Sequence, residues 1–174
     1  MIVRPETGAD WFAIDNVNRR AFGGPDEAEL VHRLRAQDAL VSLVTEDGNE
    51  VGGHLMLSRL AVVAGDRKIA AAALAPVAVL PERQRQGIGS QLVRASIVRA
   101  RELAIEAIIV LGHPDYYPRF GFSAKAAAGL KAPFSGAPLM VLKLAPGCIA
   151  GKSGAVTYPA AFGIRSPAAA LIGV

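Results

Sequence analysis

The segment Leu74–Leu92, LAPVAVLPERQRQGIGSQL, carries the strongest structural signal in the chain. An apolar run ends at Leu80, polar and basic residues follow, and an amphipathic segment begins at Ser90 after Gly87-Ile88-Gly89. This order predicts a strand, a basic turn and a helix N-terminus. The first turn of a helix leaves about four N–H groups without intrahelical partners and carries partial positive charge. Because glycines let a ligand approach the backbone closely, the turn is expected to hold an anion, most naturally phosphate.

Two other nucleotide-binding motifs fit the chain less well. A dinucleotide fingerprint needs a third glycine, but Gly87-Ile88-Gly89 is followed by Ser90-Gln91-Leu92. A phosphate-binding loop needs one more residue than Gly147–Ser153 contains, and the Gly154–Tyr158 segment after it has the pattern of a strand,. We interpret that segment as a loop. An ordinary strand-to-helix turn is the structural alternative for Gln84–Ser90.

The residues Gln84, Gly87 and Gly89 match the Q/R-x-x-G-x-G/A signature of the GNAT superfamily of N-acetyltransferases. The chain resembles that family, and within it the YhbS-like predicted acetyltransferases. The resemblance implies that this turn clamps the pyrophosphate of acetyl-coenzyme A. It also implies that the pantetheine arm pairs with the backbone of the preceding strand, where two strands splay apart. The cofactor-binding residues expected on this basis are Val77, Ala78, Val79, Gln84, Arg85, Gln86, Gly87, Ile88, Gly89 and Ser90.

A second signal lies between Ile108 and Phe122. A short apolar run ends at Gly112-His113-Pro114-Asp115, and the stretch Tyr116–Phe122, YYPRFGF, follows. It resembles the Y-x-x-x-G-F segment of the family, which places Tyr117 near the thioester sulfur. The implied role of Tyr117 is that of a general acid that protonates the coenzyme A thiolate. The alternative is that both tyrosines are packing aromatics. Many relatives carry an asparagine after this strand that helps to orient the coenzyme. This chain has Gly112-His113-Pro114-Asp115 there, so no residue is assigned that role.

The general base is left open by the sequence. Acetyl transfer to an amine needs a neutral nucleophile, and amines have a pKa of roughly 10. The available candidates are Glu27, Glu29, Glu46, His54 and His113, and none of them is assigned. No set of His, Cys and Glu residues has metal-ligand spacing, so no metal is expected.

The function indicated by the sequence is therefore transfer of an acetyl group from acetyl-coenzyme A to a primary amine. The competing hypothesis is a module that binds acyl-coenzyme A without turning it over, and only Tyr117 separates the two. The acceptor amine is not specified by any motif. Small amines, antibiotics, peptide N-termini and protein lysines all remain open, as does the identity of the acyl group.

Length and composition agree with one N-acetyltransferase-like domain spanning residues 1–174, with its core motif at 74–122 and closing strands and an apolar tail at 139–174,. No apolar run approaches the ~18 residues needed to span a bilayer, and the N-terminus lacks a signal-peptide layout. One cysteine, Cys148, excludes an internal disulfide and favours the cytoplasm,. The net charge of +4 comes from scattered arginines, so nucleic acid is a minor option,. The tail, Pro167–Val174, is expected to pack on the body or on a second subunit, which keeps a homodimer open.

The fold class expected is α/β, a mixed sheet flanked by helices. The predicted elements follow the order β-α-α-β-β-β-α-β-α-β-β. They are strands at 2–4, 41–45, 51–63, 69–79, 108–111, 139–144 and 156–161, and helices at about 7–22, 26–36, 90–104 and around 118,. Asp47-Gly48-Asn49 is the predicted hairpin turn. Pro76 inside the central strand cannot donate to a ladder, so a bulge is expected there. The family resemblance adds a mostly antiparallel, splayed, GNAT-like sheet.

Overall fold

The computed structural model describes residues 1–133, 138–149, 153–163 and 172–173. Its α-helices are α1 (Trp11–Phe22), α2 (Asp26–Gln37), α3 (Ile88–Glu102) and α4 (Ala124–Ala127). Its strands are β1 (Ile2–Pro5), β2 (Ala39–Asp47), β3 (Glu50–Ala64), β4 (Arg67–Val79), β5 (Ala107–Leu111), β6 (Leu130–Lys131), β7 (Leu139–Lys143), β8 (Gly154–Thr157) and β9 (Ile172–Gly173). Short 3-10 helices are η1 (Gly8–Asp10), η2 (Pro81–Arg83), η3 (Tyr117–Phe120) and η4 (Ala160–Phe162).

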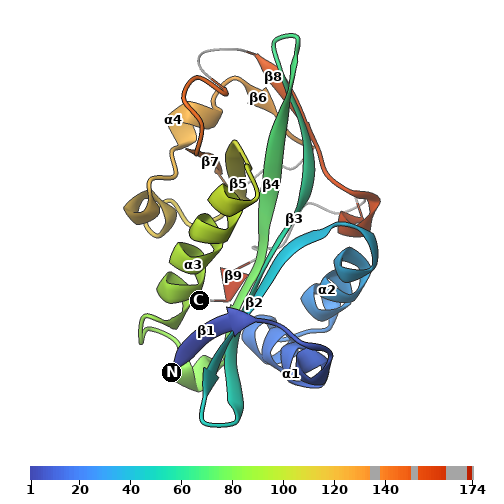
Figure 1. The fold of residues 1–174 in the computed structure, drawn as a ribbon, viewed down its shortest axis with the longest axis vertical. Helices are drawn as coiled ribbons and strands as arrows, with labels where there is room; N and C mark the ends of the chain where they lie inside the picture. Colours follow the sequence, from blue (N-terminus) through green and yellow to red (C-terminus); the bar gives the residue numbers. More distant parts are fainter. Residues whose placement is uncertain (134–137, 150–152, 164–171, 174) are drawn as a thin grey trace.

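The sheet has the order β1-β2-β3-β4-β5-β7, and its long central ribbon is formed by β3 and β4 (Figure 1). The pairs from β1 to β4 are antiparallel, and β5 pairs antiparallel with β7. The β4–β5 pair is parallel and extends only from Ala71 to Ala73 of β4. Beyond Ala73 the two strands separate, and β9 pairs with the same edge of β4 at Val77 and Ala78. The mixed, splayed sheet expected from the sequence is therefore present.

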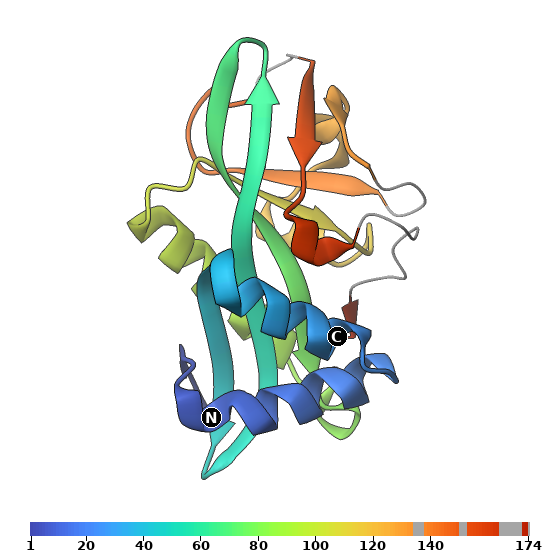
Figure 2. The same cartoon turned by 90° about the vertical axis from the view of Figure 1, so that its right-hand side faces the viewer.

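Helices cover both faces of this sheet (Figures 1 and 2). On one face α3 packs on a cluster that includes Leu43, Leu55 and Val79. On the other face α1 and α2 place Ile14 and Leu34 against strands β2 and β3. Because strand side chains alternate between faces, β2, β3 and β4 contribute to the core on both faces.

Local sequence explains most element boundaries. Gly23 ends α1 in the left-handed region at φ 75°, and Asp47-Gly48-Asn49 forms the β2–β3 turn as predicted. The expected bulge also occurs, because the β3–β4 register shifts between Leu55 and Leu57, opposite Pro76. The helix expected from Thr7 begins as η1, where the Thr7 amide donates to the Asp10 carboxylate at 2.7 Å.

Some predicted boundaries were wrong. α3 begins at Ile88, two residues before the predicted start, so Gly89 lies inside the helix. The last predicted strand, 156–161, is shifted, since β8 spans Gly154–Thr157 and η4 follows at Ala160. Of the apolar tail, only residues 172 and 173 lie within the described part of the chain.

Candidate active site

The turn between β4 and α3 presents free backbone amides. Gly87 precedes the helix at φ 84°, a conformation that favours glycine, and no side chain caps the first turn,. The first helical hydrogen bond runs from the Gln91 amide to the Gly87 carbonyl at 3.0 Å. The amides of Ile88, Gly89 and Ser90 therefore have no partner in the helix backbone. The Gln84 side chain donates to the Val79 carbonyl at 3.2 Å and ties the turn to the end of β4.

A cavity of about 470 Å³ lies directly against this turn. It is lined by Val79, Arg83, Gln84, Arg85, Gly87, Ile88, Gly89, Ser90, Tyr116 and Arg119. Arg83 is paired with Glu50 on the neighbouring hairpin. Arg85 and Arg119, in contrast, have no carboxylate partner among the residues that the structure describes. Free amides, a helix N-terminus and two unpaired guanidinium groups make this cavity suited to a polyanion.

Three predicted cofactor residues lie outside this cavity. Val77 and Ala78 are fully buried, so only their main chain could contact a ligand. In the structure β9 pairs with both of them, on the edge of β4 at which the family resemblance implies the pantetheine arm. The Gln86 side chain turns back to donate to the Glu82 carbonyl at 3.1 Å. The structure thus brings together seven of the ten predicted residues around one cavity.

The two tyrosines have different surroundings. Tyr116 lines the cavity. Its hydroxyl lies 3.4 Å from the Ser90 hydroxyl, and the Arg119 guanidinium lies 4.9 Å from its ring centroid. The Tyr117 side chain is completely buried in the same apolar cluster as Val77 and Val79. Its hydroxyl has no hydrogen-bond partner among the described residues. Burial, and to a smaller extent Tyr116, raises the pKa of Tyr117 well above its usual range.

Sequence reasoning did not assign Tyr116 or Arg119 to cofactor binding. Arg119 lies in η3 and Tyr116 directly precedes it, and this segment, distant in sequence from the turn, folds back over the start of α3. Pro118 in the first turn of η3 and Gly121 at φ 93° fix this short helix,. The one available signal was the position of both residues in the same YYPRFGF stretch as Tyr117.

The five candidate bases lie in unlike environments. Glu29 is exposed and paired with Arg33, Glu46 is paired with Arg4, and His113 is exposed. His54 is completely buried under α1 and hydrogen-bonds Asn18 and Ser42. Glu27 is buried, and burial raises its pKa. Among the described residues no group of three or more His, Cys, Asp or Glu side chains could hold a metal ion.

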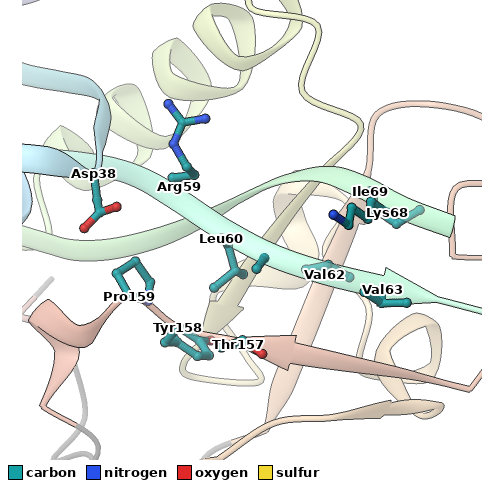
Figure 3. A pocket seen from close by; sticks show the side chains of 11 residues that line it. Asp38, Arg59, Leu60, Val62, Val63, Lys68, Ile69, Thr157, Tyr158 and Pro159 are labelled. Atoms are coloured by element: carbon teal, nitrogen blue, oxygen red, sulfur yellow. The ribbon is translucent and has the colours of Figure 1, made fainter.

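A second cavity, of about 460 Å³, lies between the β3–β4 ribbon and the segment after β8 (Figure 3). Leu60, Val62 and Tyr158 line it, and none of the predicted site residues does. Ile69 at this cavity is ten positions from Val79 along β4, which at roughly 3.3 Å per residue is a separation on the order of 30 Å. This cavity is therefore separate from the one at the turn. In the described part of the chain, no helix is long and apolar enough to cross a membrane.

The chain is similar in sequence to known acetyltransferases. A family model described as acetyltransferase (GNAT) domain matches residues 3–124. The chain is 38% identical to the uncharacterised N-acetyltransferase YjhQ of Escherichia coli, over 70% of the chain and 69% of YjhQ. It is 33% identical to the uncharacterised N-acetyltransferase YhbS of Escherichia coli, over 91% of the chain and 96% of YhbS.

Two crystal structures extend the comparison. Escherichia coli YhbS in complex with coenzyme A superposes with a TM-score of 0.85 and 31% identity, covering 95% of this chain and 93% of that one. A GNAT family acetyltransferase from Brucella melitensis in complex with acetyl-coenzyme A gives a TM-score of 0.76 and 32% identity, covering 92% and 97% of the two chains. The fold and the matching family model define an N-acetyltransferase. The chain belongs to the GNAT family, and YhbS and YjhQ are among its relatives.

Proposed function

We propose that this enzyme binds acetyl-coenzyme A at the turn and transfers the acetyl group to a primary amine by direct attack. The cavity against the uncapped start of α3 carries this proposal, because it joins free amides to Arg85 and Arg119. The pyrophosphate would accept from the amides of residues 85–90. The pantetheine arm would pair with the main chain of β4 at Val77, Ala78 and Val79, leading into the gap beyond Ala73. In this proposal, residues 1–174 form one catalytic domain. The enzyme works in the reducing cytoplasm. That it forms a homodimer stays a prediction.

Tyr117 is the proposed general acid. A buried hydroxyl with no partner among the described residues has a proton to donate and no competing acceptor. Its raised pKa keeps it protonated at every physiological pH. The leaving thiolate is also an anion, so the same apolar surroundings raise the proton affinity of the sulfur. Transfer from Tyr117 to sulfur as the C–S bond breaks gives a neutral thiol and leaves the negative charge on the Tyr117 oxygen, which regains a proton from the new amide nitrogen through solvent.

A glutamate at position 89 tests cofactor binding. Gly89→Glu adds bulk and negative charge inside the first turn of α3, where the phosphates would lie, and should abolish binding of coenzyme A. Calorimetric titration measures the affinity, and circular dichroism verifies the fold. Gly8→Glu is the matched control, because it adds the same charge at an exposed glycine where an added Cβ meets no atom within 4 Å. An unchanged affinity in a folded Gly89→Glu protein would show that the phosphates bind elsewhere.

Removal of one hydroxyl tests the acid. Tyr117→Phe keeps the buried ring, so the affinity for acetyl-coenzyme A should hardly change, while kcat falls by roughly 100-fold to 10,000-fold. The assay follows thiol release with the best acceptor from a panel of primary amines. Tyr116→Phe is the control, since it removes the neighbouring hydroxyl at the cavity wall. Equal kcat values for wild type and Tyr117→Phe would assign the proton to another donor. Coenzyme A binding without turnover of any amine would favour a sensor.

A further inference from the structure

Two carboxylates are buried in the described part of the chain, and they differ in how their charge is balanced. Asp10 is 7% exposed and accepts hydrogen bonds from the Arg4 guanidinium at 2.7 and 2.8 Å. That hydrogen bonding lowers the pKa of Asp10. Glu27 is 8% exposed and has no cationic partner among the described residues. Burial raises the pKa of Glu27 and outweighs a hydrogen bond from its own backbone that lowers it, and the nearby charge of Asp26 adds to the rise.

The position of Glu27 on α2 follows from helical spacing. Leu30, Val31 and Leu34 lie three, four and seven residues further on, and all three are buried. Residues at these spacings share one face of a helix, so Glu27 heads the inward stripe of α2. An apolar side chain would pack there without the desolvation cost of a carboxylate. Packing alone therefore does not explain a glutamate at this position, although the first turn of α2 and a hydrogen bond from its own backbone offset part of the cost of its burial,.

The end of α1, which leads into α2, packs on the part of the sheet at which the reaction is proposed. Val17, Ala21 and Phe22 near the end of α1 pack on the cluster that contains Ala78 and Leu80. α2 begins only three residues after Gly23, which ends α1. Figure 2 shows this connection at the same end of the helical layer as β9, and β9 contacts α1. Glu27 thus enters the core on the α1–α2 face, opposite the face that carries α3 and the cavity.

We propose that Glu27 binds the ammonium group of the acceptor and removes its proton, so that the amine enters from the α1–α2 face while the coenzyme enters from the α3 face. This rests on the function proposed above. This role of Glu27 requires an acceptor that is a primary amine and is cationic in solution. An ion pair buried in this place would be costly, and proton transfer from ammonium to carboxylate leaves two neutral groups.

Every proton is accounted for in the proposed steps of acetyl transfer. The ammonium gives one proton to Glu27, and the nitrogen lone pair forms the C–N bond to the thioester carbonyl. The C–S bond then breaks, and the sulfur takes the proton of Tyr117. The new amide nitrogen loses its second proton, which restores the Tyr117 hydroxyl through solvent. Glu27 releases its proton to solvent, so the products are an amide, a thiol and one proton.

The test compares two kinds of acceptor. Glu27→Gln keeps the size and polarity of the side chain but cannot accept a proton. Aliphatic primary amines are cationic at pH 7.5, whereas hydroxylamine is neutral and needs no base before attack. For Glu27→Gln we expect thiol release with the best aliphatic amine to fall by about 100-fold or more. Thiol release with hydroxylamine should stay within about threefold of wild type. Glu29→Gln, an exposed residue two positions away, is the control and should match wild type with both acceptors.

Each remaining outcome is decisive. Equal loss with both acceptors, or no loss with either, would overturn the role of Glu27 in amine deprotonation. Wild-type activity with hydroxylamine but with no aliphatic amine would also overturn it, while leaving acetyl transfer intact. Binding of coenzyme A by calorimetry without transfer to either class of acceptor would overturn the proposed function itself. Loss of coenzyme A binding in Glu27→Gln would place the residue on the cofactor side.

Discussion

At the scale of single residues, the tautomer of the buried His54 ring is determined by its hydrogen-bond partners. The Asn18 amide nitrogen donates to the Ile14 carbonyl at 2.8 Å and lies 3.1 Å from Nδ1 of His54. Because that nitrogen can only donate, Nδ1 must accept. The proton of the neutral ring therefore sits on Nε2 and is donated to the Ser42 hydroxyl at 3.0 Å. Ser42 in turn donates to the Glu6 carboxylate at 2.5 Å.

This arrangement predicts acid-sensitive stability. Burial lowers the pKa of His54 from 6.5 to about 4. Between these values the unfolded chain binds the proton and the folded one does not, so the free energy of unfolding falls as the pH falls from 6.5 to 4. At about 1.4 kcal/mol per pKa unit, the loss from this residue is at most on the order of 3 kcal/mol. Urea unfolding at pH 7, 5.5 and 4.5 measures it.

The matching variant is His54→Gln, which cannot titrate in this range. Its stability should be lower at pH 7 but should change less between pH 7 and 4.5. His113→Gln, at an exposed position, should keep the wild-type profile. Glu6 adds a slope of the same sign. Its burial raises its pKa, but hydrogen bonds from Arg35 and Ser42 outweigh that and lower it. Parallel profiles for wild type and His54→Gln would contradict the assignment of the neutral ring.

Site residues could be predicted from the sequence where they form a local motif. They could not be predicted where their role depends on burial. Gln84, Gly87 and Gly89 form a local pattern, and the structure gathers all three at one cavity. Tyr117 was found by spacing from Gly121, but its complete burial could not be read from the sequence. Glu27 and His54 were two candidates among five, because the loss of solvent that distinguishes them arises only from packing of α1 and α2.

At the scale of elements, β9 and the proposed pantetheine arm need the same edge of β4. β5 leaves that edge after Ala73, and β9 pairs with it at Val77 and Ala78. A strand edge has one row of hydrogen-bonding groups, so two partners at the same positions exclude each other. Binding of the arm is therefore expected to displace β9 from these residues.

Shortening the chain tests this competition. A protein ending at Gly163 lacks β9 and should bind coenzyme A more tightly, by roughly tenfold. That is the equivalent of about 1.4 kcal/mol, or one to two backbone hydrogen bonds. Titration calorimetry gives the two dissociation constants. A chain of full length in which residues 164–174 are replaced by glycine and serine is the control and should behave like the shortened one. Equal or weaker binding by the shortened chain would mean that β9 and the arm use different groups.

At the scale of the whole molecule, local periodicity predicts which segments are helices and which are strands. It does not predict which strands pair with one another. The hairpin of β2 and β3 was predicted because Asp47-Gly48-Asn49 joins its strands directly. The family resemblance implied that β4 and the strand after α3 splay apart, but their parallel pairing at Ala71–Ala73 was not predicted. The antiparallel pairing of β8 with β3, between residues nearly a hundred positions apart, has no local signal. The small α4, β6 and β9 are too short to give a period.

The position of β8 has a consequence for synthesis of the chain. β2 covers β3 only as far as Ser58, and β8 covers it from Ala61 to Ala64. As the polypeptide emerges from the ribosome, this part of β3 therefore waits for residues 154–157 before its outer edge is paired. An unpaired edge of alternating buried residues is a template for other strands. The interval between translation of β3 and of β8 is thus the stage at which nascent chains are most exposed to mispairing with one another.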